Sequence, residues 1–495
     1  MTLRLLLSKG APVPADAMQF KALRAQAPAS AARRVLLGGG LGLASLATLP
    51  ACAALTARRL PAFDPAELQA LVPARSTLPG IDELDDLCRE LASAGVPVQR
   101  IGTSRGGRPI HLVSPPSTAR LNVLVVGSPH PNEPIGGLTI ATLLTMLRSK
   151  HPAVAQLPVR WHFLPSIEPD GLAFNGSWLN TPHDFRAYCR GFYRPAFRHQ
   201  AEYAFPLKTG RYHFDQPTPE TRAWMSAIDQ LRPAFMASLH NVDHGGAFNI
   251  LSRPQPELAG QLSRQARGHG IALDEMGDAL GEAEVLAPGV FLAEDLATIV
   301  ERTQGVWTAG NSSFGYAAVY GTLGLAPEVP LWQEAEVHGQ RLLSDAVKGL
   351  SGSYEATIAL VEQARSLADA GAGADLRWAA TDDTAVILRR LIVIHAKLPG
   401  VPISAAMANL TRRRFRMLPL RALGMLIPWC QMQARQAGAG DRQRALDGIQ
   451  QAATDLMERE MADASLTAGM VPVPLRAAVA AQLQAVLTAA AAIAT

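Results

Sequence analysis

Residues 122–133, NVLVVGSPHPNE, decide the fold of the chain around them. The run 122–126 joins valines to leucine without a charge, which predicts a strand buried on both faces. His130 and Glu133 follow this strand, and Pro134 opens a helical pattern that continues to residue 148. Two candidate metal ligands are therefore expected in the loop at the carboxyl end of a core strand, where open α/β sheets bind their ligands.

Strand-like and helix-like runs alternate between about residues 80 and 335. They include strands at 159–167 and 234–239 and a helix at 218–231. Glycines 106 and 107 stand between two short strand-like runs, which predicts a hairpin. This alternation is typical of an α/β domain with a mixed or mostly parallel sheet.

The composition changes after residue 335, where alanine-rich helical patterns replace the strand-like runs. These patterns predict an all-helical C-terminal domain over residues 336–495, with breaks at Gly371, Pro399, Pro428 and Gly438. We expect the apolar tail at 475–494 to pack inside this bundle. The basic cluster at 411–416 is interpreted as the solvated face of a packed helix, so no stable membrane span is expected in the mature protein.

The first 53 residues predict an export signal. Arg33 and Arg34 precede an uncharged apolar run at 35–49, which is too short to span a bilayer comfortably, and small residues follow it. This pattern is typical of a twin-arginine signal, with a linker at 54–79 and a periplasmic destination. Cys52 is an alternative site for a lipid anchor, and a buried N-terminal helix in a cytoplasmic protein is the competing interpretation.

Composition and charge exclude some classes of protein. The 495 residues are 48% hydrophobic, which is ample for a large core, and the net charge is only +4. No block of lysine and arginine joins an aromatic pattern, so we expect no nucleic-acid partner. Outside the export signal, Cys88, Cys189 and Cys430 are widely spaced and match no metal motif, so we interpret them as buried thiols.

A third candidate ligand, His240, stands directly after the strand at 234–239. Two histidines and one glutamate are a common protein ligand set for catalytic zinc, which keeps a fourth position open for water. Glu328 lies in an apolar segment between two prolines, and a buried carboxylate suits a general base. His244 and Asp243, just after His240, are expected in the pocket wall.

Several short motifs keep the order found in one known family. They are IGTSRGGRPI at 101–110, EPDG at 168–171, PETR at 219–222, SLH at 238–240, and GNSS at 310–313 ahead of Glu328. With the His-x-x-Glu pair, this set resembles the carboxypeptidase A-like zinc metallocarboxypeptidases over about residues 80–335. The resemblance implies a mixed, mostly parallel eight-stranded sheet flanked by helices. It also implies one Zn²⁺ per chain, held by His130, Glu133 and His240, with Glu328 as the proton carrier.

The family's substrate-binding arginines have no clear counterpart here. The corresponding window at 184–195 is DFRAYCRGFYRP. By position, the resemblance implies that Arg186 polarises the scissile carbonyl and that Arg194 anchors a terminal carboxylate, with Arg190 as a further candidate for substrate binding. Tyr316 is the candidate for the aromatic residue that closes over the substrate.

These patterns predict a zinc metallopeptidase that hydrolyses a C-terminal, side-chain or isopeptide amide bond. The expected substrate is a peptide, including a peptidoglycan stem peptide if the protein is exported. Two alternatives stay open. One is a zinc amidohydrolase that removes the acyl group from an N-acyl amino acid, and the other is a non-catalytic binding protein on the same fold.

Overall fold

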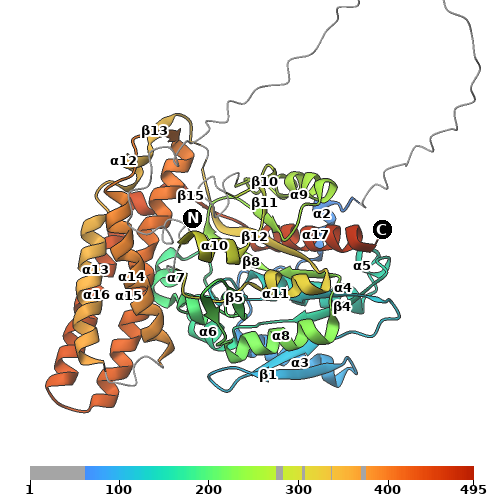
Figure 1. Cartoon of the computed structure of the whole chain (residues 1–495), viewed down its shortest axis with the longest axis horizontal. Coiled ribbons are helices and arrows are strands. Elements are labelled where there is room, and N and C mark those ends of the chain that lie inside the picture. Colours follow the sequence, from blue (N-terminus) through green and yellow to red (C-terminus); the bar gives the residue numbers. More distant parts are fainter. Residues whose placement is uncertain (1–61, 275–282, 304–306, 336, 369–374, 495) are drawn as a thin grey trace, which may run out of the picture.

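The computed structural model describes residues 62–274, 283–303, 307–335, 337–368 and 375–494. The predicted export signal, with Arg33, Arg34 and Cys52, lies outside these residues. An α/β part lies beside a bundle of long helices (Figure 1).

The α/β part is built on one mixed sheet, with strand order β1-β2-β4-β3-β7-β12-β9-β11-β10 and with β8 and β15 also paired to β12. The four neighbours β4, β3, β7 and β12 are parallel, and antiparallel pairs flank them. The strands are β1 Val98–Thr103, β2 Pro109–Val113, β3 Leu121–Val126, β4 Val159–Leu164, β7 Phe235–Ser238, β8 His240–His244, β9 Phe248–Leu251, β10 Val285–Ala287, β11 Val290–Leu292, β12 Leu323–Glu334 and β15 Met470–Pro472.

This arrangement confirms the predicted fold class, although the sheet has eleven strands rather than eight. The higher count has a simple cause. Only Leu239 separates β7 from β8, and the short strands β10 and β15 add pairing at the margins of the sheet. Short antiparallel pairs β5 Leu207–Thr209 with β6 Tyr212–Phe214 and β13 Gln340–Leu342 with β14 Pro402–Ser404 lie outside it.

Strand β3 lies inside the sheet and is buried on both faces, as its composition predicts. Val123 and Val125 belong to the large core on one face, and Leu124 and Val126 to a second core on the other. Helix α4 spans Ile135–Arg148, as predicted. Gly136 lets this helix start close to the sheet, because a Cβ at that position would lie 2.7 Å from Cβ of Leu239.

Helices cover both faces of the sheet. The first core includes residues of α2 Pro65–Leu71, α3 Ile81–Ser93, α4, α9 Pro256–Gly268 and α17 Leu475–Ala494. The second core includes residues of α8 Pro219–Leu231 and α11 Ser313–Ala317. Shorter helices stand in the connections: α5 Pro152–Ala155, α6 Pro169–Phe174, α7 Phe185–Gly191, α10 Leu296–Thr303, and the 3₁₀ turns η2 Phe197–His199, η3 Ala201–Tyr203, η4 Ala318–Tyr320 and η6 Ala464–Leu466.

The helical bundle consists of α12 Leu343–Val347, α13 Ser351–Leu367, α14 Leu376–His395, α15 Ala405–Ala437 and α16 Asp441–Ala462. The break predicted at Pro428 is wrong, because α15 runs for 33 residues through both Pro419 and Pro428. Isolated prolines disfavour a helix interior. Here, packing against α7, α14 and α16 outweighs that local preference.

The prediction that the tail packs inside the bundle is also wrong. Helix α17 lies against α2, α4, α9 and β12 in the α/β part (Figure 1). Among the described helices it alone is long and apolar enough to cross a membrane, but 83% of its apolar window is buried inside the protein. Residues 336–495 therefore do not form one separate helical unit, since β15 and α17 return to the sheet.

The basic cluster on α15 is not a solvated face. Arg413 is 4% exposed, binds Glu334 at 2.7 Å through Nε and donates to main-chain carbonyls of residues 466 and 468. Arg414 forms an ion pair with Asp274 at 2.8 Å. The bundle is thus fastened to the α/β part by charged pairs. Cys88, Cys189 and Cys430 are buried and free, as predicted.

Candidate metal centre and active site

Strand register places His240 beside Glu328. β8 and β12 run parallel, and His240 is the direct partner of Glu328 in that pair. Side chains of directly paired residues point to the same face of a sheet. Both residues are buried, at 6% and 5% exposure, and Nδ1 of His240 lies 3.8 Å from Oε1 of Glu328.

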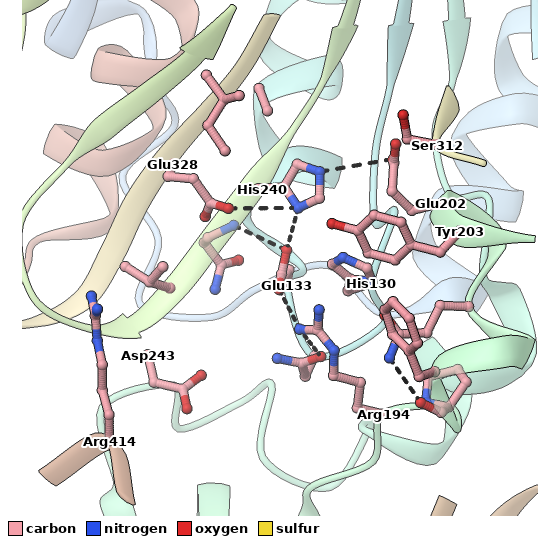
Figure 2. A pocket seen from close by; sticks show the side chains of 18 of the residues that line it. His130, Glu133, Arg194, Glu202, Tyr203, His240, Asp243, Ser312, Glu328 and Arg414 are labelled. Atoms are coloured by element: carbon pink, nitrogen blue, oxygen red, sulfur yellow. Dashed lines mark hydrogen bonds and ion pairs between the residues drawn. The ribbon is translucent and has the colours of Figure 1, made fainter. Parts of the chain in front are cut away.

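The loop after β3 brings His130 and Glu133 to the same place, because β3 neighbours β7, which leads into β8. The rings of His130 and His240 have centroids 5.0 Å apart. Glu133 Oε2 lies 2.8 Å from Nδ1 of His240 (Figure 2). Three side chains from segments more than 100 residues apart thus converge on one point, as the sequence predicts.

The donor set fits a single zinc ion. One ligand atom from each of His130, Glu133 and His240 lies within 4.8 Å of the other two. Nδ1 of His130 is buried and has no hydrogen-bond partner among the described residues. Buried polar atoms rarely lack a partner, so this nitrogen suits a metal ligand. Two histidines and a glutamate also leave one zinc position open for water.

Burial and charge act differently on the two histidines. Burial, followed by the nearby positive charge of Arg194, lowers the pKa of His130 well below its usual value, which keeps the imidazole neutral. Burial alone would lower the pKa of His240 too, but the carboxylates around it, Glu133 first, raise that pKa to about 9. In the metal-free protein, a proton on His240 therefore balances part of the negative charge that a metal would otherwise neutralise.

Arg194 lies in the pocket, beside the candidate ligands. Its Nη1 donates to Oε1 of Glu133 at 2.6 Å and approaches Oδ1 of Asn132 at 3.4 Å. The side chain is 27% exposed and lines the pocket beside the three candidate ligands (Figure 2). A guanidinium at this place can donate to an oxygen of a substrate at the metal. The anchoring of a terminal carboxylate, which the resemblance implied for Arg194, stays a prediction.

The assignments of Arg186 and Arg190 are wrong. Both side chains bind Glu458 of α16, at 2.8 and 2.7 Å, and both are about half exposed. They occupy positions i and i+4 of α7, so they lie on one face of that helix, and this face points to the bundle. Neither residue lines the pocket.

Tyr316, the predicted aromatic residue over the substrate, lies outside the pocket. Its hydroxyl donates to Asp229 of α8, and its side chain does not line the pocket. One aromatic ring beside the candidate ligands is that of Tyr203, which stacks on His130 with centroids 5.8 Å apart. Tyr203 lies in the irregular region between α7 and α8, where no periodicity indicates which side chains point inward.

The candidate ligands open into a pocket of about 370 Å³. This volume falls in the range of small-molecule sites. Asp243 and His244 lie in its wall, as predicted. Next to Glu328 the pocket is apolar, because the register pairs Glu328 with Phe248 and Ala326 with Ile250, and all four residues line it.

The bundle supplies another wall of the pocket, which the sequence analysis did not predict. Met417, Arg421 and Met425 of α15 line it, and Arg421 forms an ion pair with Asp243. Burial alone would raise the pKa of Asp243, but the guanidinium of Arg421 lowers it, so this carboxylate stays ionised.

Helix α17 contacts the main chain of the candidate site through Gln482. Nε2 of Gln482 on α17 donates to the main-chain oxygen of His240 at 2.6 Å and reaches that of Pro327 at 3.4 Å. Its own oxygen accepts from Thr139 of α4 at 2.7 Å. One buried amide thus ties the strand of the third ligand to the strand of Glu328. The sequence feature that could have indicated this contact is a glutamine inside a helix otherwise rich in alanine.

Glu168 is a buried carboxylate outside the candidate ligand set, and it binds the loop next to the site. Its Oε1 accepts from the main-chain N–H of Ala201 at 2.7 Å, and Arg105 lies 3.9 Å away. Burial, and then the neighbouring Glu220, raises the pKa of Glu168 to about 8. The folded protein therefore retains a proton that the unfolded chain releases near pH 4.5.

We expect this retained proton to make stability fall as pH rises from about 5 to 8. In that window the folded state binds more protons than the unfolded state, so the free energy of unfolding decreases with pH. Glu168→Gln removes the titrating group and should flatten this decline, changing the melting temperature by a few degrees at the alkaline end. Thermal melts at pH 5.5 and 8 measure it. Equal slopes in both proteins would contradict the prediction.

Comparison with known proteins agrees with this geometry. The sequence model of the zinc carboxypeptidase family matches residues 83–248, which include all three candidate ligands. This match confirms the resemblance over these residues, and the GNSS motif and Glu328 lie beyond them. Together, the family and the ligand cluster support a zinc metallopeptidase. No protein with a curated description matches the chain.

Solved structures with related folds are distant. A candidate metallopeptidase from Shewanella amazonensis has 17% identity and a TM-score of 0.36 over 50% of this chain and 84% of its own. Carboxypeptidase A from Helicoverpa armigera has 13% identity and a TM-score of 0.36 over 55% and 71%. A metallo-carboxypeptidase from Pseudomonas aeruginosa, solved with (2-guanidinoethylmercapto)succinic acid, has 16% identity and a TM-score of 0.32 over 50% and 59%.

Proposed function

We propose that this protein is a zinc-dependent metallopeptidase that hydrolyses a C-terminal, side-chain or isopeptide amide bond of a short peptide. The observation that carries the proposal is the convergence of His130, Glu133 and His240, with Glu328 opposite His240 in the sheet. Bound zinc supplies a Lewis acid and an acidified water in such sites. The chain supplies the ligands, the base and the donor to the oxyanion.

Glu328 acts as the proton carrier in this proposal. Its carboxylate lies on the face of β12 that lines the pocket, close to His240. From there it takes a proton from the attacking water and passes it to the leaving amine. Arg194, held beside Glu133, donates to the oxygen that becomes negative during the attack.

The apolar part of the pocket supports a preference for an apolar group near the scissile bond. Phe248, Ile250 and Ala326 form an apolar surface next to Glu328, and Met417 and Met425 of α15 face the same pocket. Burial of an apolar side chain there would favour binding by about 1.5–3 kcal/mol. An N-acylated dipeptide with a large apolar residue is thus a suitable first substrate.

We expect one zinc per chain in protein purified without a chelator. Metal analysis of the full chain measures the stoichiometry, and a chelator such as 1,10-phenanthroline should abolish hydrolysis of N-acyl dipeptides until zinc is restored. A chain that binds less than half an equivalent of zinc at saturation would contradict the proposal. Zinc binding without any hydrolysis would favour a binding protein on this fold.

The same substrates separate the two hydrolase alternatives. A peptidase that recognises a free terminus should cleave the dipeptide acid at least tenfold faster than the dipeptide amide. Hydrolysis confined to N-acyl amino acids would identify the amidohydrolase instead. Export through the twin-arginine pair Arg33–Arg34 belongs to the same proposal, since it would bring the enzyme to the peptidoglycan outside the cytoplasmic membrane.

A further inference from the structure

Glu202 is a buried carboxylate behind the metal site that no sequence motif indicated. It lies in η3, within the irregular region between α7 and α8, and is 4% exposed. Its Oε2 lies 3.9 Å from Nε2 of His240, on the side of the ring opposite Glu133 (Figure 2). This position is close enough to influence the ring and too far for direct hydrogen bonding.

Ser238 connects the two groups. Its hydroxyl donates to Oε2 of Glu202 at 2.9 Å, and its oxygen lies 3.0 Å from Nε2 of His240. A serine hydroxyl has one proton to donate. Because Ser238 donates this hydrogen to Glu202, its oxygen can only accept from His240. Nε2 of His240 must therefore carry a hydrogen.

This hydrogen has a consequence for the other ring nitrogen. A metal that binds His240 displaces the proton on Nδ1, and the imidazole is then neutral with one protonated nitrogen. The hydrogen kept on Nε2 makes Nδ1 the nitrogen whose lone pair is available. Nδ1 is the nitrogen of His240 that faces Glu133, at 2.8 Å. The chain of hydrogen bonds thus directs the lone pair of His240 into the ligand cluster.

Glu202 is itself held in place from the other side. Oε1 accepts from the main-chain N–H of Ser313 at 3.3 Å and from the hydroxyl of the same residue. Ser313 begins α11, and Ser238 ends β7, so three separate segments meet at this carboxylate. Because both carboxylate oxygens accept hydrogen bonds, Glu202 is held in the orientation in which Oε2 accepts from Ser238.

We propose that Glu202 is a positioning residue that acts through Ser238 to fix the tautomer and orientation of His240 for metal binding. The inference rests on the proposed function only in taking zinc as the metal. Partners of this kind commonly set the affinity of a ligating histidine, and their loss lowers metal affinity 10–100-fold.

The test is the zinc affinity of the full chain, measured by competition with a chromophoric chelator. Glu202→Gln keeps the shape of the side chain, but its amide can donate to Ser238 and so reverse the direction of the hydrogen bonds. We expect 10–100-fold weaker zinc binding. Ser238→Ala, which breaks the connection and leaves Glu202 in place, should weaken binding to a similar extent.

Glu168→Gln is the matched control. Glu168 is a buried carboxylate that binds Ala201, the neighbour of Glu202, but its partners do not include the candidate ligands. This variant should keep the zinc affinity of the native protein even where its melting temperature changes. A loss of affinity common to all three variants would show a general effect of folding and overturn the proposal.

A spectroscopic measurement tests the tautomer directly. Long-range ¹H–¹⁵N spectra of the zinc-loaded protein should place the ring proton of His240 on Nε2, and Glu202→Gln should broaden or shift that signal. Native zinc affinity in both Glu202→Gln and Ser238→Ala would overturn the role of Glu202 and leave the metallopeptidase intact. Failure of the native chain to bind zinc would instead refute the proposed function.

Discussion

Glu328→Gln should lower kcat by about 10²–10⁴-fold and leave zinc binding intact, since positioned acid–base groups contribute about this much to catalysis. Glutamine is close in size to glutamate but cannot take a proton from water. Glu328 contributes no atom to the candidate ligand cluster, so the metal content should stay at one per chain. Steady-state kinetics on an N-acyl dipeptide and metal analysis of the same sample measure both quantities.

The control for this substitution is Glu355→Gln, which removes an exposed carboxylate of α13. It should leave kcat, KM and zinc content unchanged. Because the loss in Glu328→Gln concerns a proton transfer, KM should also change little there. If Glu328→Gln retained more than a tenth of the native kcat at full zinc occupancy, another group would have to be the base.

Arg194→Met should lower kcat/KM by about 10²–10³-fold, the usual effect of removing one donor to a developing oxyanion. The side chain lies beside the ligands and already donates to Glu133. Methionine fills a similar volume without a charge. The measurement is kcat/KM at saturating zinc, so that any change in metal affinity is separated from the loss of the donor.

Arg186→Met provides the comparison that decides between sequence position and structure. The family resemblance implied that Arg186 polarises the carbonyl, whereas the structure pairs it with Glu458 of α16. Arg186→Met should change kcat/KM by less than threefold, because an exposed ion pair contributes only about 0–1 kcal/mol to stability and none to the reaction. Equal losses in Arg186→Met and Arg194→Met would contradict the assignment of Arg194.

Local sequence was a sufficient guide where the chemistry is local. The uncharged run at 122–126 favours a buried strand, which β3 confirms, and a proline after a loop suits the start of α4, which begins at Ile135 as predicted. His240 follows an apolar run, and Glu328 lies within one. The register of β8 and β12 pairs them, and their residue types already limited what such a pair could do.

Sequence position alone could not predict which arginine lies in the pocket. Arg186 and Arg194 are separated by eight residues in an irregular segment, and neither has a periodic pattern around it. Helix α7 turns Arg186 to the bundle, whereas the chain beyond that helix brings Arg194 to Glu133. That choice depends on where α16 places Glu458, more than 260 residues away.

The sequence by itself determined the class of fold, the candidate ligands His130, Glu133 and His240, and the candidate base Glu328. Strand ends and residue types specify the ligands, whereas an apolar run specifies Glu328, which lies inside β12. Only the tertiary structure decided what surrounds them. Glu202 and Gln482 reach His240 from distant segments, and α15 supplies a wall of the pocket. Their roles come from packing between elements far apart in the chain. Local sequence patterns do not indicate which buried side chains of such elements will be in contact.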